Sequence, residues 1–117
     1  MIIPNDMGSE FDDDQGTVTE VELEQKLGRP RLYRVMMHND DYTTRDFVVF
    51  VLRNVFLLSE ANAVQVMLHV HHNGVGIAGV YTREIAETKI QTVEQMAIEE
   101  EFPLRLTMEP EQESADA

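Results

Sequence analysis

The pattern of apolar and polar positions predicts a strand and then two helices in the first half of the chain. Residues from Leu32 to His38 alternate between the two classes, as is typical of a strand with one buried face, and Asn39-Asp40-Asp41 ends it. The next two segments repeat apolar residues at the i, i+3, i+4, i+7 spacing of amphipathic helices, with Thr43 and Ser59 expected as their N-caps. Their apolar faces consist of Val48, Val51, Leu52 and Val55, flanked by Phe47 and Phe56, and then of Ala63, Val66, Met67 and Val70.

Glycine marks the change from the second helix to a second strand. Gly74 suits the left-handed position that follows a helix C-terminus, and the strand Val75–Tyr81 comes directly after it. Gly76 and Ala78 share one face of this strand. Because both side chains are small, we expect a helix to approach the sheet closely there.

A third helix and a third strand complete the pattern. Thr82 is expected to cap the helix, and Pro103 precedes a strand over Leu104–Met108. The order β-α-α-β-α-β indicates an α+β fold, a two-layer α/β sandwich in which three helices cover one side of a three-stranded antiparallel sheet. The apolar face of the third helix consists of Ala86, Ile90, Val93 and Ala97.

The negative charge of the chain is concentrated at its two ends. Among 117 residues, 22 acidic and nine basic side chains give a net charge of −13. Residues 1–28 carry eight acids and one base, and residues 109–117 carry four acids and no base. We therefore expect a core domain over 29–109 between a flexible, disordered acidic arm, 1–28, and an acidic tail, 110–117. The arm would serve as a solubilising tail or as a functional tether, with 17–27 helical when bound.

Composition narrows the classes of function and partner. The acidic balance argues against nucleic acid and anionic membranes as partners. The absence of Cys excludes a thiolate nucleophile and favours a reducing compartment. The N-terminus does not have the pattern of a secretory signal, and no apolar run approaches the roughly 20 residues that span a bilayer. We expect a cytoplasmic protein that acts as a monomer.

Two polar features are candidates for chemistry. Asn39-Asp40-Asp41 is either an ordinary turn or a loop that presents functional groups, and it lacks the spacing of a calcium loop. His71 borders the apolar stripe through Met67 and Val70, as a core histidine or as the polar end of a binding surface. His69 and His72 could pair at a metal, but no third ligand is suggested, so we expect no metal and no cofactor. A general acid–base pair of His71 and Asp40 would have no nucleophile, which disfavours an enzyme.

Four motifs follow one another along the chain: Val35-x-x-His38-Asn39-Asp40-Asp41-Tyr42-Thr43, Phe47-Val48, Met67-Leu68-x-Val70-His71 and Gly79-Val80-Tyr81-Thr82-x-Glu84-x-Ala86-Glu87-Thr88-Lys89. In this order they closely resemble the ClpS adaptor family, over the span from about Tyr33 to Glu109. The resemblance implies a compact α/β fold and a non-enzymatic adaptor. Such an adaptor binds proteins that begin with Phe, Tyr, Trp or Leu and delivers them to a Clp-type AAA+ unfoldase and its peptidase.

The resemblance also implies roles for individual residues. Asn39, Asp40 and His71 would hold the substrate's α-amino group, and Glu84 and Lys89 would contact the N-terminal domain of the unfoldase. The acidic arm would engage the unfoldase during delivery and modulate its choice of substrate. A hydrophobic pocket would receive the first side chain, with Thr43 at its rim, Arg45 at its mouth, and a lining of Val48, Met67, Val70 and Leu104.

The sequence departs from the family pattern at the start of the first helix. Thr44 and Arg45 stand where the family usually has a proline and an apolar residue that guards the pocket. The Arg45 stem could still cover the pocket while its guanidinium points to water. The preference for the first residue therefore depends on Arg45. The alternative function is a regulatory interaction domain of the unfoldase that does not recognise N-terminal residues.

Overall fold

The computed structural model describes residue 19, residues 22–23 and residues 28–111, in two compact units, Met1–Arg31 and Leu32–Ala117. In the first unit, Thr19 Oγ1 accepts from the Glu22 amide at 3.1 Å, and the Thr19 amide donates to Glu22 Oε1 at 3.2 Å. This reciprocal pair is a capping box, which begins a helical turn. The rest of the expected helix over 17–27 lies outside the described residues. The same holds for most of the arm, which was expected to be disordered, and for the tail beyond residue 111.

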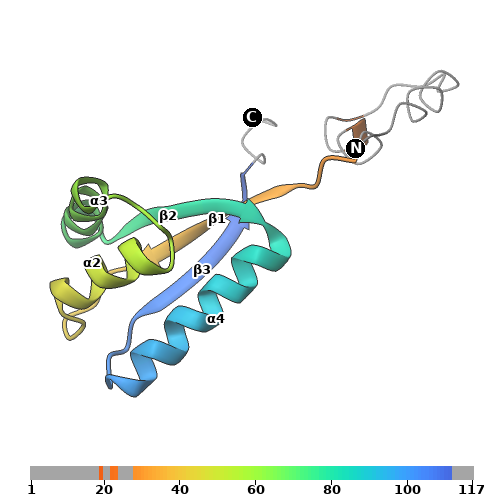
Figure 1. Ribbon diagram of the computed structural model, residues 1–117. Helices are drawn as coiled ribbons and strands as arrows, with labels where there is room; N and C mark the ends of the chain where they lie inside the picture. The colour runs from red at the N-terminus through yellow and green to blue at the C-terminus, as the bar shows by residue number, and fades with distance from the viewer. Residues whose placement is uncertain (1–18, 20–21, 24–27, 112–117) are drawn as a thin grey trace, which may run out of the picture. The chain divides into compact units, whose positions relative to one another are not determined.

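The second unit has the predicted order of elements (Figure 1): β1 (Leu32–His38), α2 (Arg45–Asn54), α3 (Glu60–Asn73), β2 (Val75–Thr82), α4 (Arg83–Glu99) and β3 (Arg105–Pro110). Both neighbours of β1 pair with it in the antiparallel sense, in the strand order β2-β1-β3. The three helices cover one face of this sheet. The predicted two-layer fold is confirmed, although β3 begins one residue later and ends two residues later than expected.

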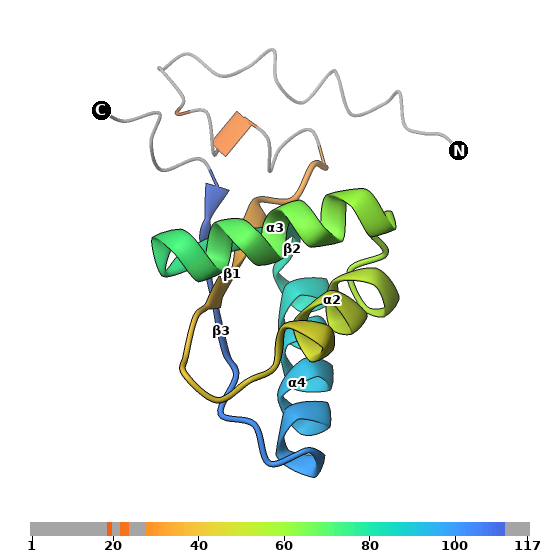
Figure 2. The same cartoon turned by 90° about the vertical axis from the view of Figure 1, so that its left-hand side faces the viewer.

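The helices lie on the sheet in two ways. In Figure 2, α3 crosses the direction of the strands, whereas α4 runs alongside β3 and approaches all three strands. The described helices are all too short or too polar to cross a lipid bilayer.

The N-cap of α2 is Thr44, so the expectation of Thr43 was wrong. Thr44 Oγ1 accepts from the Phe47 amide at 3.1 Å, while the Thr43 hydroxyl donates to Asp40 Oδ2 at 2.7 Å. The Thr43 side chain is thus hydrogen-bonded to Asp40, and Thr44 caps the helix in its place. Ser59 caps α3 as expected, with its Oγ accepting from the Asn62 amide at 3.1 Å. Thr82 occupies the cap position of α4 without a side-chain hydrogen bond.

The end of α3 packs directly on β2. Gly74 has the expected left-handed conformation, with φ of 90°. A Cβ atom added at Gly76 would lie 2.8 Å from Cγ2 of Val70, closer than real Cβ atoms come, and 3.2 Å from Cδ2 of His69, which is also a tight contact. The absence of a side chain at Gly76 therefore lets the last turn of α3 rest on the sheet, which fixes the position of Val70 and of the neighbouring His71.

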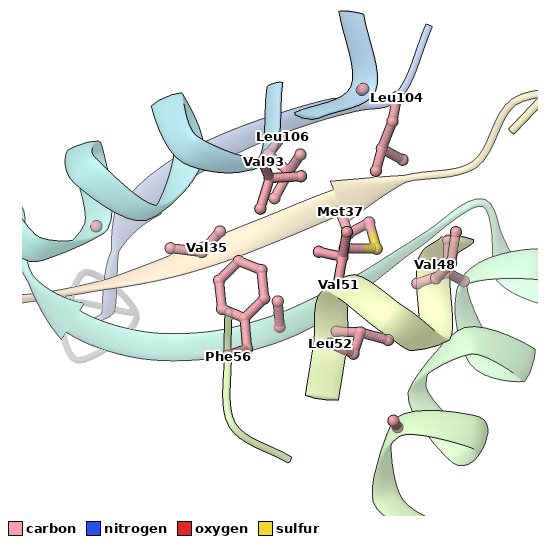
Figure 3. Close-up of a cluster of buried hydrophobic side chains, with 14 residues drawn as sticks. Val35, Met37, Val48, Val51, Leu52, Phe56, Val93, Leu104 and Leu106 are labelled. Carbon is pink, nitrogen blue, oxygen red and sulfur yellow. The ribbon is translucent and has the colours of Figure 1, made fainter. Parts of the chain in front are cut away.

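The core lies between the sheet and the helices (Figure 3). Val35 and Met37 of β1 and Val51 and Leu52 of α2 belong to the apolar cluster there, and all four side chains have 0% exposure. Truncation of such a side chain to alanine costs about 2–5 kcal/mol, or less for valine. The other labelled members of this apolar cluster are Val48, Phe56, Val93, Leu104 and Leu106.

Candidate functional site

A cavity of about 400 Å³ lies where the β1–α2 loop meets the start of α2 and the second half of α3. Its polar side comes mainly from the loop, and its apolar side from residues of the two helices. The lining residues are Asn39, Asp40, Asp41, Tyr42, Thr43, Thr44, Arg45, Val48, Met67, Val70 and His71.

Backbone and side-chain bonds fix the β1–α2 loop beside α3. The Asn39 amide donates to the Gly74 carbonyl at 2.9 Å, which continues the pairing of His38 with Val75. On the other side of β1, His38 Nε2 and Thr107 Oγ1 lie 2.8 Å apart. The loop is thereby attached both to the end of α3 and to β3.

The Asp40 carboxylate organises the same loop. Its Oδ1 accepts from the amides of Tyr42 at 2.8 Å and of Thr43 at 2.7 Å, and its Oδ2 accepts from the Thr43 hydroxyl. Burial raises the pKa of Asp40, but these three hydrogen bonds outweigh burial and leave its pKa below the usual value of 3.8. The carboxylate is therefore ionised at neutral pH. Oδ2 keeps a second lone pair, which can accept a further bond from the cavity.

The imidazole of His71 faces Arg45 across the cavity mouth. Arg45 Nη2 lies 3.0 Å from His71 Nε2, and both side chains are exposed. Because a guanidinium only donates hydrogen bonds, Nε2 must be the acceptor, which requires a neutral ring with its proton on Nδ1. The cavity therefore contains a second acceptor, which in this arrangement is already engaged.

Three side chains form the apolar side of the cavity. Val48 of α2 and Val70 of α3 are buried, and Met67 of α3 is half-buried. A methionine here can adapt to ligands of different shape because its side chain is unbranched and flexible. Leu104, which we expected in this lining, is 6% exposed in the core before β3 and does not line the cavity.

Three lining residues received no role from the sequence: Asp41, Tyr42 and Thr44. Tyr42 is 76% exposed, which is unusual for a large aromatic side chain. Each of the three is adjacent in the sequence to a residue with an expected role. This adjacency is the signal that could have identified them as lining residues.

Residues 28–107 match the family model described as ATP-dependent Clp protease adaptor protein ClpS. The chain belongs to the ClpS family. ClpS proteins are non-catalytic adaptors of the Clp protease, and the resemblance drawn from the motifs is confirmed.

Relatives support the ClpS assignment over most of the chain. The ClpS adapter protein of Myxococcus xanthus is 59% identical over 106 residues, which cover 91% of this chain and 99% of the relative. That of Desulfatibacillum aliphaticivorans is 59% identical over 87 residues, or 74% of this chain and 84% of the relative. The structure of Agrobacterium tumefaciens ClpS2 bound to L-phenylalaninamide is similar with a TM-score of 0.67 and 46% identity, over 70% of this chain and 99% of that one.

Glu84 and Lys89 lie on α4 and do not line the cavity. Glu84 is exposed, whereas Lys89 is half-buried and donates from Nζ to the Val55 carbonyl at 2.8 Å. The same Nζ is 5.2 Å from the centroid of the Tyr81 ring. Five positions apart on a helix, the two residues point about 140° away from each other. Of the two, Glu84 is the residue exposed to solvent.

The remaining histidines lie near the end of α3. Asn73 Nδ2 is 3.1 Å from His69 Nδ1, and the rings of His71 and His72 are 5.3 Å apart. Within the part of the chain that the structure describes, no three His, Cys, Asp or Glu residues gather where they could hold a metal ion.

Proposed function

We propose that this ClpS protein is an N-degron adaptor, which binds the free α-amino group and the bulky first side chain of a substrate protein and delivers that protein to a Clp AAA+ unfoldase. The observation that carries the proposal is the cavity itself, which joins an ionised carboxylate and an imidazole acceptor to an apolar lining. A free α-amino group has a pKa of roughly 7.7–8.0 and is largely protonated at neutral pH. The polar half of the cavity suits this cation.

Asn39, Asp40 and His71 are the proposed ligands of the α-ammonium. They offer an amide oxygen, a carboxylate and a ring nitrogen, and all three line the cavity. An ammonium has hydrogens for all three acceptors. A hydrogen bond that involves a charged group contributes about 1.5–3 kcal/mol. Acetylation would remove both the charge and two of the donors, and the acceptors would lose their partners.

The apolar half is the proposed pocket for the first side chain. Val48, Met67 and Val70 would surround it, with Thr43 at the rim. Burial of a Leu or Phe side chain contributes about 1.5–3 kcal/mol. The similarity to ClpS2 bound to L-phenylalaninamide supports this pocket, because that ligand has a free α-amino group and a benzyl side chain. We propose Phe, Tyr, Trp and Leu as first residues.

Delivery would use a different surface. The exposed Glu84 is the proposed contact for the N-terminal domain of the unfoldase, and Lys89 would support it from within the fold. The acidic arm, residues 1–28, would engage the unfoldase and modulate its choice of substrate. In this proposal the chain acts as a monomer, without a cofactor and without catalysis.

One observation favours a second candidate function. Because Arg45 already occupies Nε2 of His71, the chain could instead regulate the unfoldase without recognising N-terminal residues.

Fluorescence anisotropy distinguishes the two candidates. The probes are a labelled peptide that begins with Phe and the same peptide acetylated at its N-terminus. The adaptor proposal expects binding that requires the free amine. Equal affinity for both peptides, or no binding of either, would refute it.

A further inference from the structure

A hydrogen bond joins the two helices at the mouth of the cavity. Arg45 is the first residue of α2, and His71 lies in the last turn of α3. The 3.0 Å contact between Nη2 and Nε2 connects residues 26 positions apart in the sequence. Within the described part of the chain, His71 is the hydrogen-bond partner of the Arg45 side chain.

This bond uses the one acceptor nitrogen that a neutral His71 ring can offer to a bound α-ammonium. Nε2 of a neutral imidazole has a single lone pair, so it cannot accept from the guanidinium and from the ammonium at once. A guanidinium is also a cation, and it repels a second cation nearby. Among the residues that line the cavity, Arg45 is the permanent cation.

Helix stability does not account for Arg45 at this position. A cation in the first turn of a helix opposes the helix dipole, whereas the adjacent Asp46 complements it. The Arg45 side chain is exposed, so it does not fill the core either. The hydrogen bond to His71 is therefore the contact through which we explain Arg45 at this position.

We propose that Arg45 is an intramolecular competitor, which occupies Nε2 of His71 in the free protein and must be displaced by the α-ammonium of the substrate. This inference rests on the proposed function of the cavity. The competition concerns the amino group alone. Arg45 therefore weakens the binding of every substrate by the same factor, whichever side chain comes first.

Other roles for Arg45 would depend on the first side chain. A guanidinium that stacked on an aromatic ring would strengthen binding of Phe but not of Leu. A stem that narrowed the pocket would affect large side chains more than small ones. Competition predicts an effect of Arg45 on affinity that is the same for every first residue, whereas these two roles predict an effect that differs between first residues.

The test compares Arg45→Met with Arg53→Met. Met keeps a long unbranched stem at position 45 but cannot donate a hydrogen bond. Arg53 is an exposed cation in the last turn of α2 and does not line the cavity. Its replacement by Met changes the net charge of the protein by the same amount as Arg45→Met. Thermal unfolding of each variant confirms that it is folded. Anisotropy titrations then use peptides that begin with Phe and with Leu, each free and acetylated.

Competition predicts that Arg45→Met binds both free peptides roughly three- to tenfold more tightly than the wild type. Arg53→Met should match the wild type, and the acetylated peptides should gain nothing. Weaker binding of the Phe peptide alone, or a gain restricted to one first residue, would overturn the inference. If the wild type binds neither free peptide, the proposed function fails as well. If it binds them and Arg45→Met brings no gain, only the inference fails.

A measurement without ligand provides an independent check. Long-range ¹H–¹⁵N spectra of the imidazoles distinguish a ring protonated at Nδ1 from one protonated at Nε2. At a pH where the ring is neutral, we expect the Nδ1–H form for His71 in the wild type and a mixture of tautomers in Arg45→Met. The same mixture in both proteins would show that Arg45 does not hold His71, and would contradict the inference.

Discussion

The cavity and the α4 surface use their charged groups in different ways. In the cavity, neighbours in the loop orient Asp40, and its Oδ2 keeps the capacity to accept from a ligand. On α4, the ammonium of Lys89 is directed inward, to the Val55 carbonyl and the Tyr81 ring. The first arrangement prepares a charge for a ligand, and the second ties one helix to its neighbours. Substitutions in the two regions should therefore separate loss of binding from loss of stability.

The largest effect on binding is expected from Asp40→Asn. The amide can still accept from the Tyr42 and Thr43 amides, so the loop should keep its turn, but the negative charge is lost. We predict that affinity for a free Phe peptide falls by about 1.5–3 kcal/mol, or roughly ten- to hundredfold. Asp46→Asn is the matched control by anisotropy, because Asp46 is exposed and is not among the residues that line the cavity. An equal loss in both variants would indicate long-range electrostatics in place of a direct contact.

Gly76→Ala should lower both the stability of the protein and its affinity for the peptide, because Gly76 packs against Val70, which lines the cavity. The new Cβ would lie 2.8 Å from Cγ2 of Val70 and would push α3 away from β2. Overpacking of this kind lowers the free energy of unfolding by about 1–3 kcal/mol, and the shift of Val70 should weaken peptide binding too. Chemical denaturation and anisotropy measure the two effects. Ile77→Ala, on the more exposed face of β2, should leave peptide binding unchanged.

Lys89→Met should reduce stability without changing affinity for the peptide. The stem is retained, while the hydrogen bond from the ammonium to the Val55 carbonyl is lost. Because the burial cost of the ammonium is lost as well, the net cost is about 0.5–1.5 kcal/mol in the free energy of unfolding. Denaturant unfolding gives this difference. Gln91→Met is the control, because Gln91 is exposed in the interior of the same helix, and it should unfold like the wild type. A weaker peptide affinity in Lys89→Met would contradict the separation of the two regions.

The smallest effect is a pH dependence of stability. Because the pKa of Asp40 is lowered in the folded protein, its contribution is present above the usual carboxyl pKa of 3.8 and is lost as the pH falls through the lower folded value. The difference in unfolding free energy between wild type and Asp40→Asn should therefore be constant from pH 8 to pH 5 and shrink below about pH 4. A difference that grows on acidification would contradict the hydrogen bonds assigned to Asp40.

Local sequence patterns were sufficient for the fold. Apolar spacing predicted the order of the elements, and residue type predicted the Ser59 cap and the conformation of Gly74. The cap of α2 was missed because Thr43 and Thr44 are equally competent caps. Only the bond from Thr43 to the Asp40 side chain decides between them.

Contacts between distant residues were beyond reach of the sequence. Nothing near Arg45 indicates that it meets His71, and nothing near Lys89 indicates that it reaches the Val55 carbonyl, 34 positions away. Family resemblance named Asn39, Asp40 and His71, and the fold brings these three to one cavity. It also named Leu104, whose side chain lies in the core and is not among the residues that line the cavity.

The most direct test of the central claim is a titration of the ¹⁵N-labelled protein with L-phenylalaninamide, followed by amide chemical shifts. The proposed site predicts the largest shifts for Asn39, Asp40, Thr43 and His71, and none for Glu84. N-acetyl-L-phenylalaninamide, which has no free amino group, should leave the spectrum unchanged. Shifts that gather on α4, or equal shifts with the acetylated ligand, would contradict the claim that this cavity recognises a free N-terminus.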